Sequence, residues 1–289
     1  MEPTDVHFQI QAFIELAKKS GQNDVAIEKC QTNMFDKFLT EPAFQQKFGQ
    51  LIQKEIEKIK TTSGITISAD QIIPCYLFSP QLRWSRVDKE HGQPALSGGF
   101  CFNQGVAMVT EKLDGWKSRY ADFLAYEAGT PEDQVLLDQL VWFESLSLPL
   151  SGLLTPFLGC VLPNSRSFPH DFYFFDDGLI YRLPFGSYRA YIEALLANAA
   201  IKCWQYFYIP PKELVQKNRG LNYMTTQLRV STQLAEDIPF DKHDPAFTFD
   251  RLDIIHEYLE RVVRFLPMAF PTLNFDHQKR YLETLEALI

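Results

Sequence analysis

One short segment of the sequence comes close to a catalytic metal motif. Residues 256–260 read His-Glu-Tyr-Leu-Glu, and the helical zinc-protease pattern would require a second His where Glu260 stands. Asp253 precedes His256 by one helical turn, a spacing found in metal-binding helix bundles, but such sites also need ligands from other helices. We therefore interpret these residues as a charged helix flank beside an apolar stripe, and we predict no metal and no cofactor.

A second set of candidate groups surrounds a predicted hairpin turn. His170 and Asp171 lie close in sequence to Asp176 and Asp177, so they could form an acidic site for a cation or for general acid/base chemistry. The turn alone also explains the aspartates, because Asp followed by Gly suits a tight hairpin. An enzyme of unrecognised family with an acidic/His site near His170, Asp171 and Asp176 therefore stays open as the alternative function.

Signatures of the large enzyme families are missing from the sequence. It contains no phosphate-binding Gly-rich loop followed by Lys, no dinucleotide fingerprint and no Gly-x-Ser-x-Gly elbow. Its five cysteines show no paired spacing typical of a zinc or redox motif, so reduced thiols are expected. We assign no catalytic residue.

Charge is distributed unevenly along the chain. The formal net charge of −8 disfavours sequence-independent binding to nucleic-acid phosphates. Residues 120–165, the acidic stretch, contain no Lys, Arg or His. Six carboxylates lie in this stretch: Asp122, Glu127, Glu132, Asp133, Asp138 and Glu144. Such a stretch can steer a basic protein partner, and the alternative is an acidic solvated surface that maintains solubility.

Two tryptophans lie beside basic residues. Trp84 and Trp116 each have two Lys or Arg residues within three positions. Aromatic and cationic side chains together are typical of binding surfaces, and ordinary packing within a strand is the alternative. We include both tryptophans with the six carboxylates as candidate partner-binding residues.

The apolar pattern predicts an α+β protein with a central antiparallel sheet flanked by N-terminal and C-terminal helices. Residues 1–62 are expected to form an N-terminal helical segment, and residues 65–245 an α+β domain. Residues 247–289 should form two C-terminal helices that pack on that domain.

Individual elements follow from apolar spacing, caps and breakers. In the N-terminal part, one helix is expected to begin at Thr4, a second to run from Asn23 through residue 38, and a third to begin at residues 40–42 and end near residue 60. Further helices are expected from Pro131 to about residue 146, from residue 250 to residue 266, where Pro267 interrupts it, and from about residue 276. Short strands are expected near 72–78, 82–87, 100–109 and 204–209, and a further strand could lie at 227–230. The Pro/Gly-rich residues 148–169 and most of 212–245 receive no element.

The strongest local pattern lies between residues 168 and 203. Two strand-like runs, 172–175 and 179–183, flank an Asp-Asp-Gly turn. Ser187 then caps a helix from about Tyr188, in which apolar residues recur at spacings of three and four. A β-hairpin that leads directly into a capped amphipathic helix is therefore predicted.

Residues 177–195, which read DGLIYRLPFGSYRAYIEAL, resemble the end of a SUKH-superfamily domain, in which a strand delivers a Ser-aromatic start to a final helix. The resemblance is local to this hairpin and helix. Many SUKH-like proteins are bacterial immunity proteins that bind and neutralise a toxin. The resemblance therefore implies a binding protein without catalytic residues.

No targeting or membrane segment is predicted. The N-terminus lacks a basic region followed by an apolar stretch, and the most apolar segment, 146–162, is interrupted by Pro and Gly. We expect a cytoplasmic, non-enzymatic protein-binding module of the immunity type, with a basic, toxin-like protein as partner and no nucleic acid or membrane.

Overall fold

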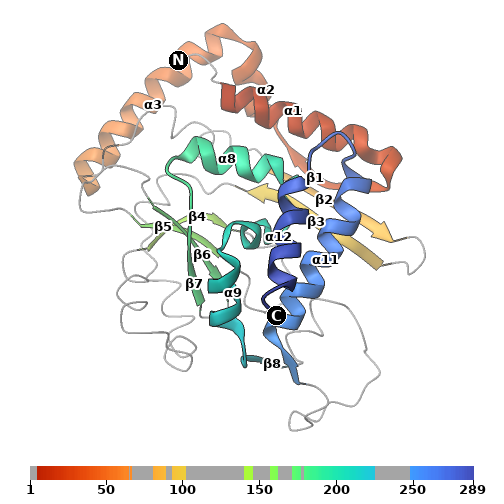
Figure 1. Cartoon of the computed structure of the whole chain (residues 1–289). Helices are drawn as coiled ribbons and strands as arrows, with labels where there is room; N and C mark the ends of the chain where they lie inside the picture. Colours follow the sequence, from red (N-terminus) through yellow and green to blue (C-terminus); the bar gives the residue numbers. More distant parts are fainter. Residues whose placement is uncertain are drawn as a thin grey trace.

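Helices and antiparallel strands make up the described part of the protein (Figure 1). The computed structural model describes residues 5–64, 66, 81–88, 93–101, 140–145, 157–161, 171–176, 179–224 and 248–289. The predicted α+β class, with helices at both ends, is confirmed. The strands in these ranges form three antiparallel sheets with the orders β1-β2-β3, β4-β5-β6-β7 and β8-β9. None of the helices in these ranges is both long enough and apolar enough to cross a membrane.

The first sheet contains one strand from a segment that was predicted to be helical. Its strands are β1 (Val25–Gln31), β2 (Gln81–Asp88) and β3 (Gln93–Cys101). The helix expected from Asn23 through residue 38 is wrong over 25–31, because β1 pairs there with β2, and only its second part is helical, in the helix that begins at Asn33. Expected elements at 72–78 and 103–109 lie outside the described residues.

Three helices accompany this sheet: α1 (Asp5–Lys19), α2 (Asn33–Thr40) and α3 (Pro42–Ser63). The predicted apolar face of α1 is confirmed, since it buries Val6, Ile10, Phe13, Ile14 and Ala17. Pro42 occupies the first turn of α3, where its missing N–H would have no intrahelical partner. The predicted cap Thr4 lies outside the described residues.

The second sheet contains the predicted hairpin. Strands β6 (Asp171–Asp176) and β7 (Leu179–Leu183) pair antiparallel, which confirms this prediction. Strands β4 (Leu140–Ser145) and β5 (Phe157–Val161) extend the sheet. The helix predicted up to residue 146 is therefore wrong over 140–145, because a short apolar run fits a helix stripe and a strand equally well and the pairing with β5 decides.

Helix α8 (Tyr188–Ala197) follows the hairpin, as predicted. Ser187 caps it, because its Oγ accepts a hydrogen bond from the Ala190 N–H at 3.1 Å. The strand expected at 204–209 is wrong, since this segment forms the 3-10 helix η2 (Trp204–Tyr208). The left-handed backbone of Cys203, with a φ of 58°, turns the chain into η2. Helix α9 (Pro211–Asn218) then forms where no element was assigned.

The two predicted C-terminal helices are confirmed as α11 (Arg251–Ala269) and α12 (Asp276–Glu286). A short sheet of β8 (Asn222–Met224) and β9 (Thr248–Asp250) precedes them. Pro267 lies inside α11, so the expected interruption there is wrong and the helix ends two residues later, at Ala269. The possible strand at 227–230 lies outside the described residues.

Residues 199–202, which we call the linking segment, join the first sheet to the C-terminal helices. The carbonyls of this segment accept hydrogen bonds from the Gly99 N–H at 2.7 Å, from Trp84 Nε1 at 3.0 Å and from the Tyr258 hydroxyl of α11. The Lys202 N–H also donates a hydrogen bond to the Ser97 carbonyl of β3, at 3.1 Å. The segment therefore closes the outer edge of β3 and connects it to α11.

Candidate functional site

Trp84 belongs to the core and not to a binding surface. Its side chain is 0% exposed, its indole lies edge-on to Phe270 at 4.9 Å between ring centroids, and its Nε1 donates to the Ala199 carbonyl. The prediction that Trp84 contacts a partner is therefore wrong. The alternative of packing within a strand describes this residue, because its indole fills the space between the sheet and α11.

The structure describes the backbone position of one of the six acidic residues of the acidic stretch. Glu144 lies in β4, which is an outer strand of the second sheet and pairs with β5 on one side. The other candidate partner-binding residues lie outside the described residues: Trp116, Asp122, Glu127, Glu132, Asp133 and Asp138. The described part of the acidic stretch is thus a pair of antiparallel strands, β4 and β5, at one end of the sheet.

One acidic residue of the β6–β7 hairpin, Asp171, has a described side-chain partner. Asp171 Oδ1 accepts a hydrogen bond from Arg182 Nη2 at 2.6 Å, across the two strands. This contact raises the pKa of the Arg182 guanidinium, because the carboxylate stabilises its charged form. Asp176 lies opposite Leu179 in the ladder, and His170 lies outside the described residues. In this part of the hairpin, Asp171 acts as one half of a cross-strand ion pair.

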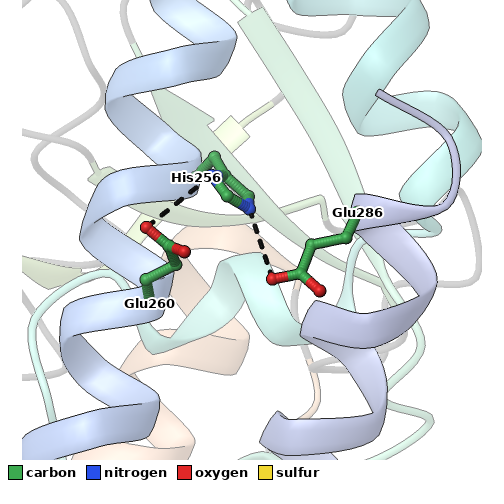
Figure 2. Close-up of side chains that lie close together, drawn as sticks. All are labelled: His256, Glu260 and Glu286. Atoms are coloured by element: carbon green, nitrogen blue, oxygen red, sulfur yellow. Dashed lines mark ion pairs between the residues drawn. The ribbon is translucent and has the colours of Figure 1, made fainter.

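A different group of side chains comes together between α11 and α12. Figure 2 shows His256 between two glutamates, Glu260 on its own helix and Glu286 on α12. His256 Nδ1 lies 3.9 Å from Glu260 Oε2, and Nε2 lies 3.6 Å from Glu286 Oε1. One ligand atom from each residue lies within 4.8 Å of the other two. We call this group the His256 cluster.

The apolar faces of the two helices position the His256 cluster. Leu259 of α11 and Leu285 of α12 are both 0% exposed, and each precedes a cluster glutamate by one residue. The glutamates therefore lie at the boundary between core and solvent, with about half of each side chain exposed (52% for Glu260 and 47% for Glu286). The imidazole is more enclosed, at 25% exposure, and its Nε2 has no hydrogen-bond partner among the described residues.

Hydrogen bonds to the residues that directly follow η2 and α8 hold α12 in the position that the cluster requires. The Tyr281 hydroxyl donates to the Ile209 carbonyl at 2.8 Å, and Gln278 Nε2 donates to Asn198 Oδ1. Burial raises the pKa of Tyr281, since a phenolate at this site would lose its hydration. These hydrogen bonds fix the buried side of α12, and this places Glu286 next to α11.

The sequence pattern indicated His256 and Glu260 of this cluster but not Glu286. It identified His256 and Glu260 by their spacing and required ligands from another helix, but it gave Glu286 no role. Glu286 carries no local signal, because it is an ordinary acidic residue in the last turn of an amphipathic helix. Asp253, which shares the helical spacing, is not a member of the cluster.

Comparisons with protein-family models, with curated protein sequences and with solved structures find no match for this chain.

Proposed function

We propose that this protein is a non-enzymatic protein-binding module whose partner is a basic protein. The observation that carries the proposal is the acidic stretch, in which six carboxylates and no basic residue occur over residues 120–165. A surface of one charge sign attracts a partner of the opposite sign over about one Debye length, roughly 8–10 Å at physiological salt.

The position of β4 supports this proposal. Within the described residues, β4 is one of the two outer strands of the second sheet, so its second edge is not paired in that sheet, and it carries Glu144. Strands at a sheet edge are frequent docking sites, because their main chain and alternate side chains can both be recognised. The charge on such a strand would discourage self-association and favour a basic partner.

The resemblance of residues 177–195 to SUKH domains suggests which partner class to test first. We propose a bacterial toxin, which the module would bind and neutralise as an immunity protein, and we place the module in the cytoplasm. The described ion pair between Asp171 and Arg182 supports a structural use of the hairpin, in agreement with a binding role.

The test measures association kinetics after the partner has been isolated from the native host. Glu132→Lys with Asp133→Lys should lower the on-rate by about tenfold at low salt while leaving the off-rate nearly unchanged, because exposed charges mainly act on the encounter. Added salt should lower the on-rate of the unmodified protein and reduce the difference between the two proteins.

The matched control is Glu57→Lys with Glu283→Lys, two exposed glutamates outside the acidic stretch that change the net charge by the same amount. These changes should affect the on-rate less than the reversals in the stretch. Equal effects of both pairs, or kinetics that do not depend on salt, would show that the acidic stretch does not direct binding. Protection of cells against the isolated partner then tests the immunity role.

A further inference from the structure

We infer that His256, Glu260 and Glu286 form a binding site for a divalent transition-metal ion such as Zn²⁺, with one ligand atom from each residue. The proposed binding function does not depend on this site. The acidic stretch and the His256 cluster occupy different segments of the chain, so that either proposal can fail alone.

The three side chains of the cluster are close enough together to reach one ion. One ligand atom from each residue lies within 4.8 Å of the other two. Two ligands that each lie about 2.1 Å from one tetrahedral ion are separated by roughly 3.4 Å. Small rotations of the two half-exposed carboxylates would bring all three groups to this spacing.

The imidazole provides a second, independent indication. In the part of the chain that the structure describes, His256 Nε2 is buried and makes no hydrogen bond, although it faces the Glu286 carboxylate at 3.6 Å. A buried ring nitrogen without a partner has lost its hydration, and a bound ion would restore a strong interaction.

The chemistry of the three groups decides which ion they would prefer. One imidazole and two carboxylates suit Zn²⁺ and its neighbours in the first transition series, whereas Mg²⁺ and Ca²⁺ prefer oxygen ligands alone. Three protein ligands leave at least one position for water. The earlier expectation of no metal depended on the missing second His, and the structure offers Glu260 and Glu286 in its place.

A bound ion would connect the last turn of α12 to the middle of α11. Such a ligand stabilises the folded chain, because the unfolded chain lacks the arrangement that brings Glu286 to His256. Zn²⁺ binding should therefore raise the melting temperature, and the increase should depend on the side chains of the cluster.

The experiment titrates the full chain, freed of metal by chelator and dialysis, with ZnCl₂ in a calorimeter. We expect one Zn²⁺ per chain, and we expect Glu286→Gln to weaken binding by at least about tenfold. His256→Ala should weaken it further. Glu283→Gln is the matched control, since Glu283 is also an exposed glutamate of α12 but lies outside the cluster, and this variant should bind as the unmodified chain does.

A second measurement separates coordination from loose attraction of cations to surface charge. Co²⁺ in place of Zn²⁺ should give visible absorption bands that Glu286→Gln abolishes and Glu283→Gln keeps, and MgCl₂ should not raise the melting temperature. Absence of Zn²⁺ binding, or binding that is the same in Glu286→Gln and Glu283→Gln, would overturn the inference.

Discussion

The contact between β3 and the linking segment leaves no space for a side chain at Gly98. A Cβ added there would lie 2.6 Å from the Ala200 carbonyl oxygen and 2.6 Å from Cζ2 of Trp84. Neither neighbour can move freely, because Ala200 accepts the Gly99 N–H bond and Trp84 is fully buried. Gly98→Ala should therefore push the linking segment away from the sheet.

The expected cost of Gly98→Ala follows from these contacts. Overpacking of a buried site costs about 1–3 kcal/mol. Weakening the hydrogen bonds that Ala199 and Ala200 accept from the sheet should add roughly 1 kcal/mol. We expect a loss of about 3 kcal/mol in the free energy of unfolding, a large part of the roughly 5–15 kcal/mol typical of a folded protein.

Urea denaturation followed by tryptophan fluorescence measures this loss. Gly186→Ala is the control, since no atom of the described residues lies within 4 Å of a Cβ at that position, and it should change stability by less than about 0.5 kcal/mol. In a Trp84→Leu background the cost of Gly98→Ala should be smaller, because the contact with the indole is gone. A cost below about 1 kcal/mol for Gly98→Ala in the unmodified chain would refute this account of the contact.

Two further predictions concern α8 and α12. Leu195 is fully buried, so Leu195→Ala should lower the free energy of unfolding by about 2–5 kcal/mol. Ser187→Ala should lower it by about 0.5–2 kcal/mol through loss of the cap. Chemical denaturation of both variants tests whether the Leu195 change is the more costly one. Because burial raises the pKa of Tyr281 in the folded state, the unfolded chain loses this proton first, and stability should fall above about pH 10 by up to about 1.4 kcal/mol per pH unit for this group. Tyr281→Phe should make that fall shallower in denaturation measured from pH 8 to 11, and an unchanged slope would contradict the assignment.

Local patterns predicted the elements whose signals are complete within a few residues. The two hairpin strands β6 and β7, the Ser187 cap and the apolar stripe of α11 each follow from residues that lie close together in the sequence. These parts of the fold were confirmed for that reason.

The errors occur where distant segments decide the structure. Residues 25–31 carry apolar residues at helical spacing, but hydrogen bonds to β2 hold them as a strand. The aromatic run 204–208 has strand-like composition, and the left-handed Cys203 turns it into a 3-10 helix instead. Glu286 was missed in the same way, since its nearness to His256 depends on how α12 packs on α11.

The linking segment also bears on how the protein matures during synthesis. The Trp84 indole donates a hydrogen bond to the Ala199 carbonyl of this segment, and the two residues are separated by 115 positions along the chain. A ribosome that adds about 5–20 residues per second needs roughly 6–23 s to make that length of chain. Throughout this interval the nascent first sheet lacks the partners that later cover β3, so an emerging chain presents an unfinished strand edge to chaperones and to neighbouring nascent chains.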